Sequence, residues 1–292
     1  MANPFATGRC KLTGSVGRFV RSHLIPEALT KLSRTGERMI EAGIGIQPIL
    51  RPTSWYDRAL VVRHGEDILS RIDWRGIEEL RLHRLVWSSW GEVQELPADD
   101  LVIEGGVPHL RWIDIADPGP LRIFFLSLAW RAGATVRPEF KFSRIDRDIV
   151  EDLRVRVANE NPGAPEHYPI QLYQLVTRGA AHNRVPMLER KRVVNIDGSD
   201  AGLTLEYLRF YFDGLVAHVH LAMKVAVPKP YLRYSCVGFQ RKTPIFAHRY
   251  EASRASADIM EMMQTVMKEQ RVRGPSRHIS GDVDGPRKDK KR

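Results

Sequence analysis

Residues Cys10 to Thr30 read Cys-Lys-Leu-Thr-Gly-Ser-Val-Gly-Arg-Phe-Val-Arg-Ser-His-Leu-Ile-Pro-Glu-Ala-Leu-Thr. The cysteine opens a knuckle-like turn, after which Arg18 to Arg21 read as a short basic strand. Proline suits the first turn of a helix, so Pro26 predicts a start toward helix. His23 is therefore expected at the end of a strand, directly before that turn.

Two more elements complete the predicted N-terminal region. Trp55 to Val62 is predicted to be a strand, and Glu66 to Trp87 carries a loose apolar stripe at helical spacing. Gly43 to Pro48 lies between the two strands and is predicted to be a loop. The order strand, strand, helix indicates a ββα unit with an insertion.

The middle of the chain is predicted to be helical. Asp117 to Pro120 marks a break, and the apolar stretch that follows predicts a buried helix over Leu121–Ala132. This stretch is about half the ~20 residues that a membrane span needs, so no membrane partner is expected. A second helix is predicted over Asp146–Ala158, ending at Asn161-Pro162-Gly163.

From Pro169 onward the pattern changes to alternation, which is typical of strands. The predicted strands are Ile170–Leu175, Val193–Ile196, Leu203–Phe212 and Leu215–Val225. Asp213-Gly214 is a strong hairpin signal, and a helix with Ile259, Met262, Met263 and Met267 is expected to close the ordered chain. The predicted fold is thus α+β, with a ββα region over 1–95, a helical centre and antiparallel β-meander over 96–270, and a disordered basic tail over 271–292.

Composition favours a polyanionic partner. The formal charge is +10, and residues 271–292 hold eight basic and three acidic residues, which is half of that excess. Cys10 and Cys236 lie far apart, so no disulfide framework is expected and a reducing cytoplasm is the natural setting. The N-terminus has no apolar core of signal-peptide length.

Further short motifs follow the opening stretch in a fixed order. They are Tyr56-Asp57, Leu60 to Glu66, Ile72-Asp73, Phe124 to Ala132 ending in Trp-Arg-Ala, Phe140-Lys141-Phe142, Asn161-Pro162-Gly163 and Phe212 to Leu215. Together with Ser22-His23-Leu24-Ile25-Pro26, this series resembles a bacterial group of HNH-like proteins with a Ser-His-Ile-Ile-Pro signature and two Cys-x-x-Cys knuckles. The resemblance spans roughly residues 10–225.

The resemblance implies a ββα-metal endonuclease in which His23 is the general base for phosphodiester hydrolysis. Side chains near the base would hold a divalent ion, Mg²⁺ first. The candidates are His64, Glu66, Asp67 and Asp73, with Asp57 on the preceding strand, and Glu66 and Asp67 align best with the ligand region of the resembling group; Glu66, Asp67 and Asp73 are the predicted ligands. The knuckle positions are Cys10, Thr13, Val62 and Gly65 here, so no structural zinc is expected, because valine and glycine offer no ligand. Nucleic acid is the implied partner, DNA ahead of RNA, with phosphate contacts from Lys11, Arg18, Arg21, Lys288, Lys290 and Lys291.

Other interpretations stay open. The finger could have lost catalysis and now bind nucleic acid or a protein, for example in phage defence or a mobile element. His23 could tie a turn to backbone carbonyls, and Glu66, Asp67 and Asp73 could simply favour a helix start. His218 and His220 share one strand face and could ligate a metal, although an exposed strand face explains them better.

Overall fold

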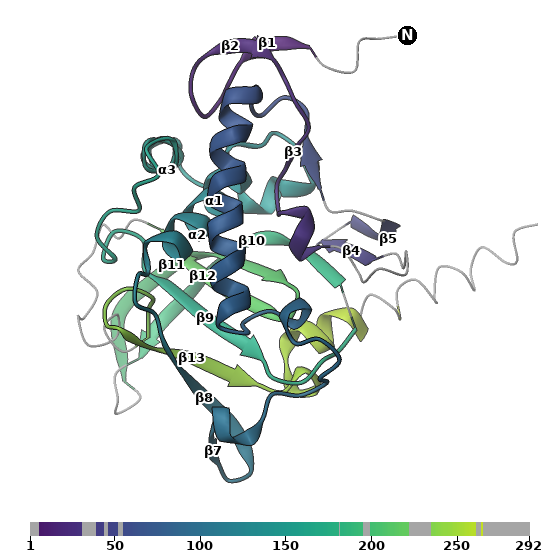
Figure 1. Cartoon of the computed structure of the whole chain (residues 1–292), viewed down its shortest axis with the longest axis vertical. Helices are drawn as coiled ribbons and strands as arrows, with labels where there is room; N and C mark the ends of the chain where they lie inside the picture. Colours follow the sequence, from purple (N-terminus) through teal and green to yellow (C-terminus); the bar gives the residue numbers. More distant parts are fainter. Residues whose placement is uncertain are drawn as a thin grey trace, which may run out of the picture.

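A computed structural model describes residues 6–30, 39–43, 46–51, 55–180, 182–194, 199–221, 235–260 and 264 of the chain. Three helices and one large sheet form its body (Figure 1). The helices are α1 (Arg63–Leu82), α2 (Gly119–Ala134) and α3 (Arg147–Ala158), and the short 3-10 turns are η1 (Glu27–Leu29), η2 (Trp87–Ser89), η3 (Ala98–Asp100), η4 (Pro138–Ser143) and η5 (Tyr250–Ala252). The α+β class predicted from the sequence is confirmed.

The large sheet has nine strands in the described part of the chain, in the order β5-β4-β10-β11-β12-β9-β13-β8-β7. Their bounds are β4 (Met39–Gly43), β5 (Ile46–Arg51), β7 (Val102–Glu104), β8 (Val107–Asp114), β9 (Ile170–Leu175), β10 (His182–Val194), β11 (Asp200–Phe212), β12 (Leu215–His220) and β13 (Lys242–His248). The predicted antiparallel meander holds for β10, β11 and β12. The sheet as a whole is mixed, because β4 runs parallel to β10 and β13 runs parallel to β9.

Helix α2 is the centre of the core. Every residue from Leu121 to Ala132 is buried, which confirms the predicted buried helix. Each fully buried large apolar side chain contributes roughly 1.5–3 kcal/mol, so this one helix supplies much of the hydrophobic stabilisation. Helix α3 confirms the second predicted helix to within one residue at its start.

The N-terminal region differs from the predicted ββα unit: of the strand predicted at Arg18–Arg21 only Arg18 lies in a strand, and of the strand predicted at Trp55–Val62 only Tyr56–Asp57 does. Strand β3 (Ser22–His23) pairs antiparallel with β6 (Tyr56–Asp57), and α1 follows. A small hairpin, β1 (Thr7–Arg9) with β2 (Val16–Arg18), lies over the N-terminal end of α1 (Figure 1). The insertion between β3 and β6 corrects the loop predicted at Gly43–Pro48, because it forms the hairpin β4–β5 and joins the large sheet.

One apolar core crosses the boundary predicted near residue 95. The main cluster of buried residues runs from Cys10 in the N-terminal hairpin to Ile245 in β13. The turn predicted at Asp213-Gly214 is present, with Gly214 at φ +77°. Trp87 packs directly on Gly214, where any side chain would collide with the indole, so the C-terminal hairpin is locked to the segment that follows α1.

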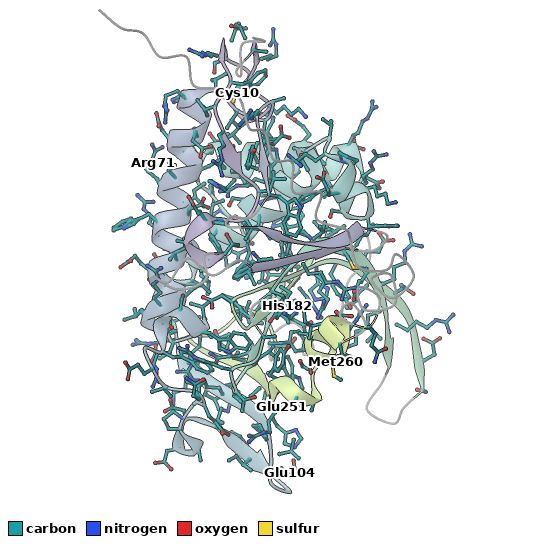
Figure 2. The ribbon with its side chains drawn as sticks, turned by 90° about the vertical axis from the view of Figure 1, so that its right-hand side faces the viewer. Cys10, Arg71, Glu104, His182, Glu251 and Met260 are labelled. Atoms are coloured by element: carbon teal, nitrogen blue, oxygen red, sulfur yellow. The ribbon has the colours of Figure 1, made fainter. Side chains whose placement is uncertain are left out.

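Two remaining predictions concern the ends of the described chain. Residues 254–260 are helical, as predicted for the closing helix, and Met260 marks them beside the sheet in Figure 2. Met262, Met263, Met267 and the predicted basic tail lie outside the described residues. Among the helices that the structure describes, none has the length and apolarity to cross a membrane.

Candidate functional site

His23 lies on the short ribbon formed by β3 and β6. Ser22 pairs with Asp57, and His23 pairs with Tyr56. The buried guanidinium of Arg131, from α2, donates a hydrogen bond of 3.1 Å from Nη1 to the His23 carbonyl oxygen. The backbone of His23 is therefore held by β6 on one side and by the central helix on the other.

The imidazole of His23 has charged groups of both signs beside one ring nitrogen. Its Nε2 lies 3.5 Å from Nη2 of Arg21 and 3.9 Å from Oε2 of Glu27. The ring meets Tyr56 edge-on, with 6.4 Å between centroids. The side chain is 20% exposed, so a ligand in solvent can reach it. An imidazole placed beside a carboxylate can accept or deliver a proton.

Three arginines surround the ring of Tyr56. The guanidinium carbons of Arg21, Arg58 and Arg137 lie 4.1, 5.3 and 6.0 Å from the ring centroid. Arg137 also donates to the Tyr56 carbonyl oxygen at 2.7 Å, and its hydrogen bond to Glu139 raises the pKa of the guanidinium. We call Arg21, His23, Tyr56, Arg58 and Arg137 the Tyr56 surface. Its planar cations beside an aromatic face suit phosphate and nucleobase chemistry.

Asp57 belongs to the scaffold of this ribbon. The carboxylate is buried and accepts hydrogen bonds from the Ala59 amide at 2.8 Å and from Thr135 Oγ1 at 2.7 Å. These bonds fix the turn after β6 and tie it to the residue that follows α2. Asp57, a possible metal ligand from sequence, thus has both carboxylate oxygens engaged in the fold.

Of the three predicted metal ligands on α1, Glu66 and Asp73 both interact with Arg131, whereas Asp67 lies apart from them. Glu66 and Asp73 are two turns apart and face the body of the protein, whereas Asp67 is exposed on another side of the helix. Asp73 accepts a 2.6 Å hydrogen bond from Nη2 of Arg131, which already neutralises it. Burial raises the pKa of Glu66 and of Asp73, and the Arg131 charge opposes the rise in both.

The expected Mg²⁺ set is therefore not assembled in the described chain. Within the described residues there is no group of three His, Cys, Asp or Glu side chains that could hold a metal ion. A hard divalent cation needs several oxygen ligands around one point. The described residues do not fit that requirement.

The four knuckle positions lie on two segments that pack against each other. The Thr13 amide lies 3.5 Å from Cys10 Sγ, and a side-chain carbon at Gly65 would lie 2.7 Å from the same sulfur. Val62 is buried at the start of α1, and Figure 2 shows Cys10 beside that end of the helix. Apolar contact thus fills the place between the two turns.

The predicted phosphate-binding residues have different surroundings. The ammonium group of Lys11 donates a 2.8 Å hydrogen bond to the carbonyl oxygen of Ala134, at the C-terminal end of α2. Arg18 is exposed on β2, and Arg21 belongs to the Tyr56 surface. Lys288, Lys290 and Lys291 lie outside the described residues. Lys11 thus has a structural partner, and Arg21 is the predicted residue that joins His23.

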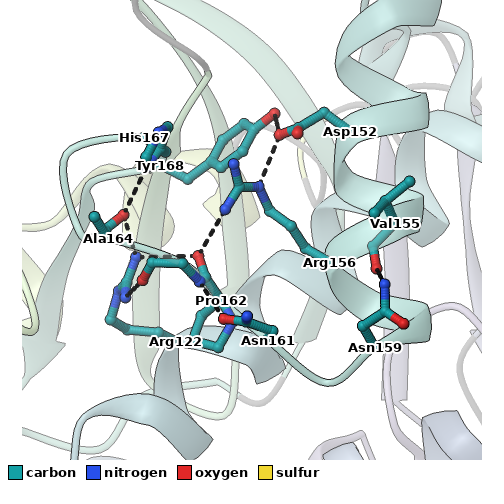
Figure 3. Close-up of polar contacts among 11 residues, drawn as sticks. Arg122, Asp152, Val155, Arg156, Asn159, Asn161, Pro162, Ala164, His167 and Tyr168 are labelled. Carbon is teal, nitrogen blue, oxygen red and sulfur yellow. Dashed lines mark hydrogen bonds and ion pairs between the residues drawn. The ribbon is translucent and has the colours of Figure 1, made fainter.

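Another motif of the resemblance has a structural task. Arg122 of α2 donates to the carbonyl oxygens of Gly163 at 2.5 Å and Ala164 at 2.9 Å (Figure 3). Burial lowers its pKa to about 10, still well above neutrality. Arg156 of α3 pairs with Asp152 at 2.8 Å and donates to the Pro162 carbonyl oxygen at 3.3 Å. The Asn161-Pro162-Gly163 turn is therefore held by Arg122 and Arg156.

The prediction of an exposed strand face is wrong for His220 and only partly right for His218, which is partly exposed. His220 is buried and its Nε2 lies 3.0 Å from Oε1 of Gln171, while His218 packs between Tyr173 and Tyr207. Burial lowers the pKa of both imidazoles, that of His220 to about 4. Both rings are therefore neutral near pH 7 and act as aromatic groups.

Sequence reasoning missed several residues of the Tyr56 surface. Tyr56 belongs to the short motif Tyr56-Asp57, and Arg58 follows it directly. A prediction that this motif pairs with the strand of His23 would have placed both residues at the site. Arg137 and Glu27 come near only through the fold. Comparisons with protein-family models, with curated proteins and with solved structures gave no match.

Proposed function

We propose that this chain is an HNH-like nucleic-acid-binding protein and that the Tyr56 surface is its contact with the phosphate backbone. The single observation that carries this proposal is the convergence of Arg21, Arg58 and Arg137 on one aromatic ring beside His23. DNA is the first partner to test, because the resembling group is nuclease-like.

Charge and chemistry support this proposal. Guanidinium groups bind phosphate oxygens with two parallel hydrogen bonds, and an aromatic ring beside them can stack on a base or a sugar. The chain's net charge of +10 strengthens attraction to a polyanion at low salt. Glu139 at the rim pairs with Arg137 and restrains it, which reduces the entropy lost on binding.

The test is fluorescence anisotropy with a labelled DNA duplex at fixed salt. Arg58→Ala removes one exposed cation of the surface, and Arg190→Ala removes an exposed arginine of β10 that is paired with Glu206. A hydrogen bond to a charged group contributes about 1.5–3 kcal/mol, so Arg58→Ala should weaken binding about tenfold or more. Equal affinity of the two variants would remove the Tyr56 surface from the binding site.

A second candidate function is phosphodiester hydrolysis with His23 as general base, the activity implied by the resemblance. One contact favours it: the Glu27 carboxylate lies 3.9 Å from His23 Nε2 and can hold the ring in place for proton transfer. The assay is cleavage of plasmid and of single-stranded DNA with Mg²⁺, Mn²⁺ or Zn²⁺ added. Cleavage should be lost in His23→Ala, and equal cleavage by the two proteins would exclude His23 as the base.

A further inference from the structure

A row of stacked rings crosses four neighbouring strands on the face of the large sheet opposite α2. The centroid of Tyr173 in β9 lies 4.9 Å from that of Phe246 in β13, with the ring planes 21° apart. On its other side Tyr173 lies 4.6 Å from His218 in β12, which in turn lies 4.2 Å from Tyr207 in β11. We call these residues, with His248 and Trp112, the aromatic face.

Register places these side chains on one surface. Phe246 is the partner of Tyr173, and His218 is the partner of both Gln171 and Arg209. Directly paired residues share a face, and their neighbours along each strand point the other way. Leu172, Ala217 and Phe210 accordingly belong to the core on the α2 side, and Trp112, paired with Pro244, joins the aromatic face.

Part of the row is fixed and part is accessible. Tyr207 is buried and its hydroxyl donates to Glu189 at 3.2 Å, so one end of the row is anchored. Trp112 is 49% exposed, His248 is exposed, and Tyr173, His218 and Phe246 are partly exposed. A half-exposed tryptophan beside preorganised rings is an unusual surface for a strand face that only covers a core.

Cations flank the aromatic face on the side of β10 and β11. Burial lowers the pKa of His218 most, and the nearby charges of Arg209, Lys191 and Arg254 lower it further. Lys191 is exposed, and the side chain of Arg254 is half exposed while it pairs with Glu189. An aromatic surface bordered by cations is complementary to an unpaired nucleic-acid strand, whose bases stack on rings and whose phosphates attract the cations.

We propose that the aromatic face is a second nucleic-acid site, which binds a single strand through base stacking on Trp112, through contacts to the partly exposed Phe246 and Tyr173, and through phosphate contacts to Lys191 and Arg254. Sequence-tolerant stacking needs no base-edge hydrogen bonds, so either DNA or RNA can occupy it. The site lies on the sheet, apart from the β3–β6 ribbon, and it does not depend on the Tyr56 surface.

The experiment measures anisotropy of labelled oligothymidylate and oligouridylate of about fifteen nucleotides, which spans one typical stacking site. Trp112→Ala should weaken binding about 5- to 100-fold, because stacking on one ring contributes ~1–3 kcal/mol per base. Trp74→Ala is the matched control, since Trp74 on α1 is 65% exposed and lies on a different element. Lys191→Ala gives a second test of single-strand affinity, because it removes a cation and leaves the packing of the rings intact.

Four results decide the proposal. Loss of single-strand binding in Trp112→Ala and in Lys191→Ala, with Trp74→Ala unchanged, supports it. Equal affinity of Trp112→Ala and wild type overturns it, as does an equal loss in Trp74→Ala. Loss in Arg58→Ala alone assigns single strands to the Tyr56 surface instead. Duplex binding measured in parallel separates the two sites, because Trp112→Ala should leave it unchanged even if the Tyr56 surface fails its own test.

Discussion

Replacing Arg131 with methionine should strongly destabilise the fold. The guanidinium is 1% exposed and joins three parts of the chain, because it donates to the carbonyl oxygen of His23 and to the carboxylate of Asp73 from its place on α2. Methionine keeps most of the apolar volume but removes every donor. Asp73 would then be left as a largely buried carboxylate without its counter-charge.

The magnitude follows from that orphaned charge. Breaking a buried ion pair by removing one partner costs about 3–5 kcal/mol. Removal of both charges should cost less, so the Arg131→Met, Asp73→Asn double variant should regain part of the loss. Burial already raises the pKa of Asp73, and loss of Arg131 would raise it further. The loss of free energy of unfolding in Arg131→Met should therefore become smaller as the pH falls through the pKa of Asp73, where protonation removes the buried charge.

The assay is urea unfolding followed by tryptophan fluorescence. Arg190→Met is the control, because Arg190 and Glu206 form an exposed pair with side chains 71% and 42% exposed, and such pairs contribute about 0–1 kcal/mol. A free energy of unfolding for Arg131→Met that equals that of Arg190→Met would refute the reasoning. A loss of stability in Arg131→Met that becomes larger as the pH is lowered would also refute it.

Three further predictions test other parts of the account. Gly65→Ala should lower the free energy of unfolding by about 1–3 kcal/mol, because the added carbon would lie 2.7 Å from Cys10 Sγ. The control Ser70→Ala, on the exposed side of α1, should be nearly neutral in the same chemical unfolding assay. An unchanged free energy of unfolding in Gly65→Ala would show that the two turns can separate. Glu66→Gln should stabilise the protein near neutral pH, because burial raises the pKa of Glu66. The gain in stability should fade as the pH falls through that pKa, where the wild-type carboxylate becomes protonated. A gain in thermal stability that does not depend on pH would contradict burial of the charge as its cause. Arg122→Met should cost about 2–4 kcal/mol and speed proteolysis of the loop at Gly163, because the carbonyl groups of Gly163 and Ala164 lose their buried donor. Equal cleavage of wild type and variant would refute the role of Arg122.

The helices were predictable because their signals are local. The stretch over Leu121–Ala132 is apolar on all sides, and a helix in contact with other elements all round needs that composition. Helix α3 shows its stripe within twelve residues. The Asp213-Gly214 turn was predictable for a similar reason, since the turn type demands those residues.

The sheet was less predictable, since strand partners come from distant parts of the chain. Strands β4 and β8 pair with strands that lie more than a hundred residues later, and no local pattern records that choice. Alternation correctly put His218 and His220 on one face. It could not show that Tyr173 and Tyr207, from other strands, would pack against His218.

The candidate site was predictable only in part for the same reason. His23 and Arg21 are two residues apart and could be placed together. Tyr56 and Arg58 come beside His23 through the β3–β6 pairing, and Arg137 reaches Tyr56 through the turn after α2. The partners of Lys11 and Asp73 are a helix end and a buried arginine of α2, which no spacing in the sequence indicates.

The salt dependence of duplex binding tests the central claim most directly. Each phosphate contact contributes about −0.9 to the slope of log affinity against log salt concentration. The Arg21→Ala, Arg58→Ala double variant should therefore have a slope less steep by about 2 than wild type, if each arginine neutralises one phosphate. A double variant with the wild-type slope and affinity would show that the Tyr56 surface does not contact nucleic acid.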